Sequence, residues 1–124
     1  MEGYSTAIRE VSKELSARER IKLKDTTNAI KLDEAANGEP LVITPVAYAI
    51  LDIHNEKSDN IDYPNYIIMD EAGNKYVTGS ESFWTSFKEI WDEMKNEKEP
   101  YQIEVYKVDS KNYKGKQFLT CSIV

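Results

Sequence analysis

The chain has 124 residues, which is enough for one domain with a single modest core, and its 40% hydrophobic and 31% charged residues are ordinary for a soluble globular protein. No apolar run approaches the roughly 20 residues that span a bilayer. The first residues show no secretory signal, and Cys121 is the only cysteine, so we expect a cytoplasmic protein without disulfides.

Charge is unevenly distributed along the chain. The net charge of −6 weighs against a nucleic-acid partner. However, residues 1–31 hold seven Lys/Arg and five Asp/Glu, and residues 107–124 hold four Lys and one Asp. Screening over about 8 Å at physiological salt makes such local clusters more important than the distant acids. Both basic segments are therefore candidates for contact with phosphate groups.

The N-terminal segment carries helix formers with loosely spaced apolar residues at Ile8, Val11 and Leu15. We expect residues 5–20 to form a helix, or an arm that orders only on a partner. A turn at residues 37–40 suggests an N-terminal arm over residues 1–32 and a compact domain over residues 33–124. The arm's apolar residues must pack on the same chain, on a neighbouring subunit or on nucleic acid. We favour the neighbour, and hence a homo-oligomer.

The compact domain reads as strands around one helix. Residues 41–53 predict a long strand that bends near Pro45, and residues 54–62 a loop. Residues 66–70 and 75–78 predict a hairpin with Gly73 at positive φ in its turn. Ser80 is the expected N-cap of a helix whose stripe is Phe83, Trp84, Phe87, Ile90, Trp91 and Met94. Residues 101–108 and 117–124 predict the last two strands.

This order of elements predicts a mainly β fold with one core helix. A helix between the third and fourth of five strands is the order of an OB-fold, a five-stranded Greek-key barrel. The aromatic stripe would then close the bottom of the barrel.

Three segments carry a resemblance to a known family: HNEKSDN at residues 54–60, GSESFW at 79–84 and SKNYKGK at 110–116. In this order and spacing they resemble the small single-stranded DNA-binding proteins of phages and conjugative plasmids of Gram-positive bacteria. The resemblance covers the chain from about Val11 onward. It implies an OB-fold that coats single-stranded DNA during replication or transfer, without sequence preference. The residues themselves leave the choice between DNA and RNA open.

The last hairpin holds most of the candidate site residues. Cations follow a phosphate backbone and aromatic rings stack on unpaired bases, and this hairpin mixes both kinds of residue. Symmetric pairing would place Tyr106 opposite Phe118 on the outer face. Ile103 and Val105 would lie on the core face with Leu119, Cys121 and Ile123. The expected binding residues here are Tyr106, Lys107, Lys111, Tyr113, Lys114, Lys116 and Phe118. The alternative for Tyr106 and Phe118 is a purely structural cross-strand pair.

Three further candidates lie earlier in the chain. Tyr66 and Tyr76 flank the predicted tight hairpin, on the strands where an OB-fold takes its ligand, and either stack on bases or pack within the sheet. Lys57 in the first long loop is a weaker phosphate candidate. We expect Tyr48, Trp84 and Trp91 to serve the core or an interface.

Little in the sequence indicates catalysis. His54 is the only histidine, so neither a zinc site nor any other metal site or cofactor is expected. Cys121 alternates with Leu119 and Ile123, which favours a buried structural thiol over a nucleophile paired with His54. We therefore expect a non-enzymatic protein. The second hypothesis is a small acidic protein that mimics DNA and inhibits a host nuclease or defence complex.

Overall fold

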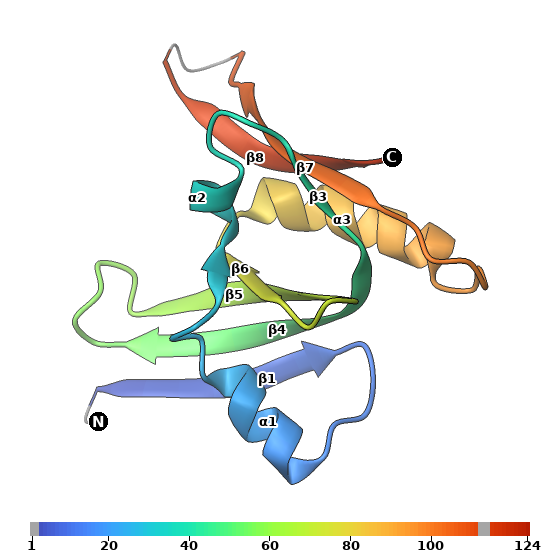
Figure 1. Cartoon of the computed structure of the whole chain (residues 1–124). Coiled ribbons are helices and arrows are strands. Elements are labelled where there is room, and N and C mark those ends of the chain that lie inside the picture. The colour runs from blue at the N-terminus through green and yellow to red at the C-terminus, as the bar shows by residue number, and fades with distance from the viewer. Residues whose placement is uncertain (1–2, 112–114) are drawn as a thin grey trace.

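The computed structural model describes residues 3–111 and 115–124, and within them the chain is mainly β, as predicted (Figure 1). One sheet has five strands in the order β1-β4-β5-β6-β2, and the other has three in the order β3-β7-β8. The strands are β1 (Tyr4–Val11), β2 (Ile30–Lys31), β3 (Leu41–Ile43), β4 (Pro45–Asn55), β5 (Asp62–Asp70), β6 (Lys75–Thr78), β7 (Ile103–Asp109) and β8 (Gln117–Ile123). The helices are α1 (Ala17–Lys24), α2 (Leu32–Ala35) and α3 (Glu81–Met94).

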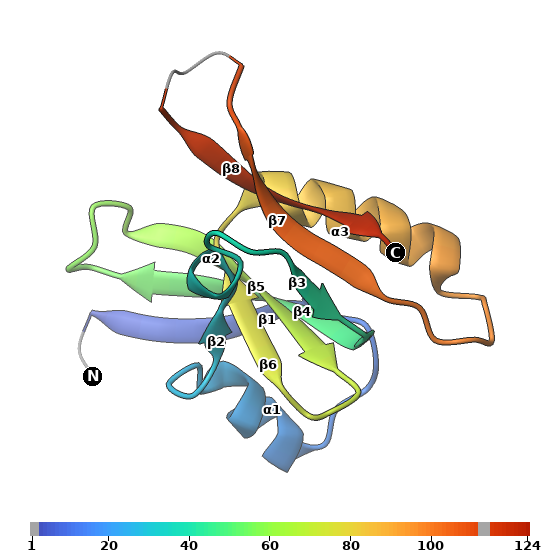
Figure 2. The ribbon, with the colours of Figure 1, turned by 45° about the horizontal axis from the view of Figure 1, so that its top comes forward.

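The predicted long strand over 41–53 is two strands that belong to different sheets. β3 pairs with β7 in one sheet, and after Thr44 the chain bends at Pro45 into β4, which pairs with β5 in the other. Because proline cannot donate to a ladder hydrogen bond, it suits such a corner. β7, the predicted fourth strand, thus returns beside the first. β7 therefore neighbours β3 in the three-stranded sheet, while β4, β5 and β6 are neighbours in the five-stranded sheet (Figure 2).

The closure of a barrel is not seen among the described strands. A closed barrel of this order needs β6 to meet β8, and these two strands do not pair. Instead β2 lies parallel to β6, with Ile30 beside Tyr76 and Lys31 beside Val77. A strand has only two edges, and at these residues β5 and β2 occupy both edges of β6. The described architecture is therefore two separate sheets.

The predicted β5–β6 hairpin is confirmed. Gly73 has φ of 90° in its turn, a conformation that favours glycine. Asp70 holds the turn by accepting hydrogen bonds from the backbone N of Asn74 at 2.7 Å and from its side-chain Nδ2 at 3.1 Å. The same carboxylate accepts a hydrogen bond from the hydroxyl of Tyr76 at 3.1 Å. Side chains from both strands thus fix the register of the hairpin.

The main core lies between the two sheets and is filled from one side by α3. Ser80 caps this helix as predicted, since its Oγ accepts a hydrogen bond from the backbone N of Phe83 at 3.2 Å. Phe83 and Phe87 of the predicted stripe are fully buried, among residues of both sheets and of α2. The helix between the third and fourth predicted strands therefore packs on the core as expected.

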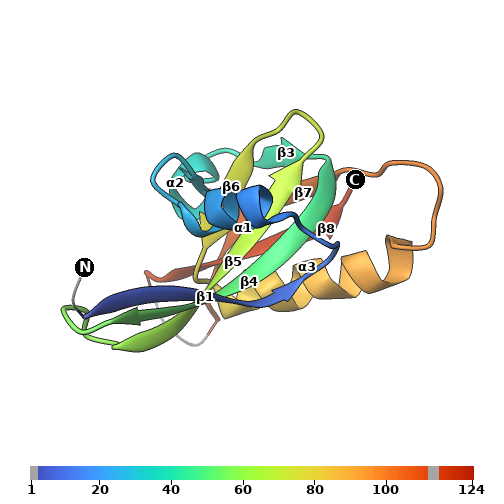
Figure 3. The ribbon, with the colours of Figure 1, turned by 90° about the horizontal axis from the view of Figure 1, so that it is seen from below.

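The expectation of a helix over residues 5–20 is wrong for residues 5–16. Residues 4–11 form β1, which pairs antiparallel with β4, and the helix α1 begins only at Ala17. Ser16 starts it with a capping box: its Oγ accepts from the backbone N of Glu19, whose carboxylate accepts from the backbone N of Ser16. α1 lies on the face of the five-stranded sheet opposite to α3 (Figure 3).

The apolar residues of the N-terminal segment pack on the sheet of their own chain. Leu23 is 4% exposed in a second cluster with Ala49, Leu51, Ile53 and Ile67. Ile8, Val11 and Leu15 pack against its edge. Of the three packing partners considered from the sequence, the same chain is the one seen here. Segment 3–32 thereby contributes two strands to the larger sheet.

Candidate nucleic-acid interface

The β7–β8 hairpin has the predicted faces but a different register. Tyr106 pairs with Thr120 and Phe118 pairs with Val108, so Tyr106 and Phe118 are diagonal neighbours and not directly opposite each other. The seven-residue loop 110–116 shifts the pairing by two residues, and a shift by two leaves every side chain on its predicted face. Ile103, Val105, Leu119 and Cys121 are accordingly buried. Ile123 is 49% exposed, against expectation, because it lies at the end of the edge strand β8.

The outer face of the hairpin, here called the hairpin face, carries Tyr106, Val108 and Phe118. Phe118 is 41% exposed and Val108 37%, so a large apolar surface faces solvent on this ribbon. Tyr106 is half-buried, and its hydroxyl is 2.6 Å from the hydroxyl of Ser122. That hydrogen bond orients the ring of Tyr106 along the strand. Phe118 is thus the ring of this face that is most available for stacking.

The lysines of the hairpin lie on different sides of it. Lys107 shares the side of Leu119, where its Nζ donates a hydrogen bond to Oδ1 of Asn37 at 3.4 Å. Lys111 and Lys116 are exposed in the loop that joins the strands. Tyr113 and Lys114 lie outside the described residues. The described cations therefore flank the hairpin face at its outer end and along one edge.

A shallow pocket of about 480 Å³ separates the hairpin from the segment that follows α2. Tyr106, Lys107 and Gln117 line it from the hairpin, together with residues 36–40 and Glu104. Glu39 and Glu104 bring negative charge to this hollow. A phosphate group in this pocket would consequently be repelled by the two glutamates and attracted by Lys107.

Tyr66 and Tyr76, which were predicted as base-stacking candidates, lie on the core face of their strands. They are 5% and 6% exposed. The ring of Tyr66 stacks on Trp84 with centroids 4.8 Å apart and planes 5° from parallel. Burial raises the pKa of both phenols. In this conformation neither ring offers a face to a base, and both serve the packing of α3 on the sheet.

The aromatic residues that were expected in the core are there. Tyr48 is 6% exposed and makes edge contacts with the rings of Trp84, Phe87 and Trp91. Its hydroxyl donates a hydrogen bond to the carboxylate of Glu10 on β1. The two tryptophans pack against the main core, as predicted.

Lys57 lies in the loop between β4 and β5, where it is exposed. Its backbone N donates a hydrogen bond to Oδ1 of Asn55 at 3.1 Å, which stabilises the start of the turn. Figure 1 shows this loop at the left of the molecule and the β7–β8 hairpin at the top. Glu56 and Asp59 beside it weaken the local positive charge.

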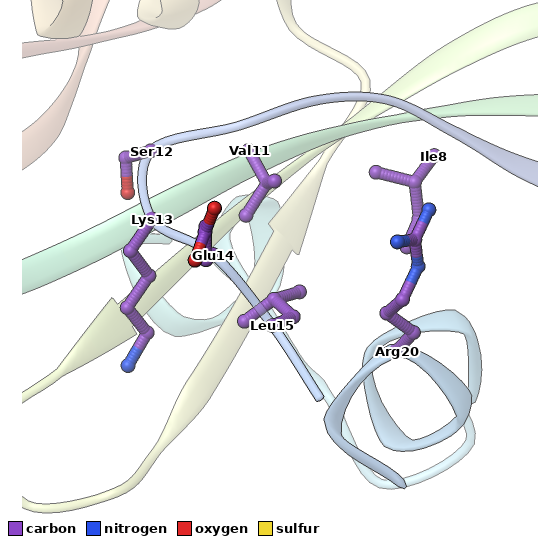
Figure 4. Close-up of a pocket in the computed structure, with 7 residues that line it drawn as sticks. All are labelled: Ile8, Val11, Ser12, Lys13, Glu14, Leu15 and Arg20. Atoms are coloured by element: carbon purple, nitrogen blue, oxygen red, sulfur yellow. The ribbon is translucent and has the colours of Figure 1, made fainter. Parts of the chain in front are cut away.

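A second basic region was missed by residue-level reasoning on the sequence. A pocket of about 500 Å³ opens between β1 and α1, with Ile8, Val11 and Leu15 as its apolar wall (Figure 4). Arg20 extends from α1 toward Ile8, while Lys13 lies at the other end of the pocket (Figure 4). The sequence signalled this region only as an excess of Lys/Arg over residues 1–31.

Lys75 extends this basic region onto the sheet. A second pocket of about 300 Å³ lies between Lys13, Lys22 and Lys75, and Glu19 also lines it. The Nζ of Lys75 donates hydrogen bonds to the backbone O of Lys22, at 2.6 Å, and to that of Asp25. These carbonyls belong to the C-terminal end of α1, where the helix dipole favours a cation. Burial lowers the pKa of Lys75, and the charge of Asp25 opposes this effect.

We call these two pockets together the basic groove. The cations that line it are Lys13, Arg20, Lys22 and Lys75. It lies on the outer face of β4, β5 and β6, away from the main core. α1 and Leu23 cover part of that face.

The groups considered for catalysis lie in unrelated settings. Burial raises the pKa of the Cys121 thiol to about 12, which suits a structural residue. The side chain of His54 is 41% exposed, with its Nδ1 2.7 Å from a carboxylate oxygen of Asp62 and its Nε2 3.7 Å from a carboxylate oxygen of Glu56. The hydrogen bond to Asp62 is the main reason that the pKa of His54 is raised. Within the described residues, no three His, Cys, Asp or Glu side chains are grouped so as to hold a metal ion.

Comparison with known proteins adds no assignment, since no family model, no curated protein and no solved structure matches this chain. In the described part of the chain, none of the helices has the length and apolar character needed to cross a membrane.

Proposed function

We propose that this protein binds single-stranded DNA without sequence preference and coats it during the replication or transfer of a phage or plasmid genome. The observation that carries the proposal is the hairpin face, where the exposed ring of Phe118 lies on a ribbon whose loop presents Lys111 and Lys116. Stacking on a ring tolerates every base, and lysines contact phosphate regardless of sequence. Such a surface can bind single-stranded DNA of any sequence.

The arrangement of strands is consistent with this proposal. An OB-fold binds oligonucleotides across its second and third strands and between the loops that flank them. The equivalent strands here are β5 and β6, and the flanking segments are the β4–β5 loop with Lys57 and the β7–β8 hairpin. The features that support an OB type are the pairing of β7 with β3 and the position of α3 between β6 and β7.

The path on the outer face of β5 and β6 is partly covered by α1. A single-stranded DNA that followed this face of the sheet would meet the cations of the basic groove instead of the rings of Tyr66 and Tyr76. We therefore assign stacking to the hairpin face and phosphate contact to the hairpin lysines and the basic groove.

The test is a fluorescence anisotropy titration with a labelled oligo-dT of about 30 nucleotides, roughly twice the largest site usual for one OB-fold. We expect saturable binding at low salt that weakens steeply as salt rises, because phosphate contacts release counterions. A mixed-sequence single strand should bind with similar affinity, and a duplex should bind more weakly. Titration with an oligo-U RNA of the same length shows whether the protein prefers DNA or RNA. No binding at low salt would refute the proposal and favour the acidic inhibitor of a nuclease.

A further inference from the structure

The outward side of α1 carries an exposed isoleucine between two cations. Leu23 points into the second cluster and is 4% exposed, whereas Ile21 is 71% exposed. Arg18, Ile21 and Lys24 are spaced three residues apart, so they share the side of the helix that faces away from the sheet. We call these three residues the α1 ridge. Neither Arg18 nor Lys24 forms an ion pair within the described residues.

The C-terminal half of α3 carries the complementary surface. A pocket of about 420 Å³ is lined by Ile90, Met94 and Ile123, with Glu89 and Glu93 along one side, and we call it the α3 groove. Ile123 is 49% exposed at this groove. The two glutamates make no ion pair among the described residues, since the salt bridges of this helix join Lys88 and Lys95 to Asp92.

We propose that the α1 ridge of one copy of this chain docks in the α3 groove of a second copy. Ile21 would enter the apolar hollow, and Arg18 and Lys24 would face Glu89 and Glu93. The cations lie six residues apart, about 9 Å along the helix, and the glutamates four residues apart, about 6 Å, a difference that long side chains span.

The position of the two surfaces makes this contact head-to-tail. α1 and α3 lie on opposite faces of the five-stranded sheet (Figure 3), so one protomer can use its ridge and its groove at the same time. A contact between two different surfaces does not end at a dimer unless the rotation closes a ring. The contact is small and therefore weak between free molecules. Copies held side by side on one strand would form it far more readily, because their effective concentration is high.

Disulfide trapping tests the contact without any nucleic acid, so its result is independent of the proposed function. The natural Cys121 is 6% exposed and will not interfere. The double variant Ile21→Cys with Met94→Cys should give a ladder of oligomers on a non-reducing gel after mild oxidation. Each single variant should stop at a dimer at most. A mixture of the two single variants should give the mixed dimer as its main product.

The matched control pairs Ile21→Cys with Asn60→Cys, which lies exposed in the β4–β5 loop. This variant should give no ladder above the level of random collision. If it equals the Ile21/Met94 variant, or if the latter gives no ladder, the proposal is wrong.

Charge reversal supplies a second criterion in the same trapping background. Glu89→Lys with Glu93→Lys should slow ladder formation several-fold, and so should Arg18→Glu with Lys24→Glu. Combining all four changes should restore it, because the charges are again complementary. All these positions are on the surface, and thermal melts should show that each variant is folded. Unchanged ladder yield after either reversal, or no recovery in the combined variant, would overturn the assignment of these residues.

Discussion

Replacing Phe118 with alanine is expected to weaken binding to single-stranded DNA much more than it destabilises the fold. The side chain is 41% exposed and stands opposite Val108, so the fold loses one half-exposed cross-strand pair. Such a pair contributes about 0.2–1 kcal/mol. A base stacked on the ring contributes about 1–3 kcal/mol. The affinity should therefore fall about 5- to 150-fold, while the free energy of unfolding falls by less than about 1 kcal/mol.

Val108→Ala is the matched control for this experiment. It removes the other half of the same cross-strand pair and leaves the ring of Phe118 in place. Phe118→Trp should retain affinity, since a larger ring still stacks. Anisotropy titrations give the affinities, and urea unfolding of the same samples gives the stabilities. Equal affinity of the Phe118→Ala and wild-type proteins, with a loss of stability matching that of Val108→Ala, would make Phe118 a structural residue only.

Three other predictions concern the loop lysines, α1 and pH. Changing Lys111 and Lys116 together to glutamine should reduce the slope of log affinity against log salt by about 1.4, at about 0.7 per phosphate contact on a single strand. Leu23→Ala should cost about 2–5 kcal/mol in urea unfolding and remove hydrogen-exchange protection from α1, because this side chain is 4% exposed and anchors the helix. The pKa of His54 is raised above 6.5, chiefly by its hydrogen bond to Asp62. The protonated imidazole therefore stabilises the fold fully below pH 6.5, and this stabilisation is lost as the pH rises through the raised pKa. His54→Gln should abolish this pH dependence of the melting temperature.

Local signals explain why the turn of the β5–β6 hairpin and the start of α3 were predicted correctly, although β5 begins four residues earlier than predicted, at Asp62. These signals are Gly73 in the hairpin turn, Ser80 at the N-cap of α3 and the aromatic stripe of α3. Each determines the structure of residues that are close to it in the sequence. β1 has no such signal, because it is an edge strand that is largely exposed and its residues also suit a helix. Its strand conformation comes from pairing with β4, some 40 residues away in the sequence. The register of β7 with β8 likewise depends on the length of the loop 110–116, which the residue types alone do not fix.

The interpretation of Tyr66 and Tyr76 as base-stacking residues failed for a related reason. In β5 the neighbours Ile67 and Ile68 are both fully buried, since α1 covers one face of the strand and α3 packs toward the other. A strand buried on both faces has no polar and apolar alternation that would tell the core side from the ligand side. On β7 and β8 only one face is buried, and there strand parity placed the side chains correctly. The hairpin face could therefore be predicted from the sequence, whereas the basic groove could be recognised only once the fold of the N-terminal segment was known.

Two groups of positive charges have roles that an experiment can separate. Lys111 and Lys116 lie beside the hairpin face, while Arg18 and Lys24 point outward from α1. If the first group contacts phosphate and the second contacts a neighbouring copy, Arg18→Glu with Lys24→Glu should leave affinity unchanged for an oligonucleotide that holds one protein copy. The same variant should bind a long strand with lower cooperativity, seen as a broader transition in a titration at fixed salt. Equal weakening on the short and the long strand would instead make the α1 ridge a phosphate contact, and would remove it from assembly.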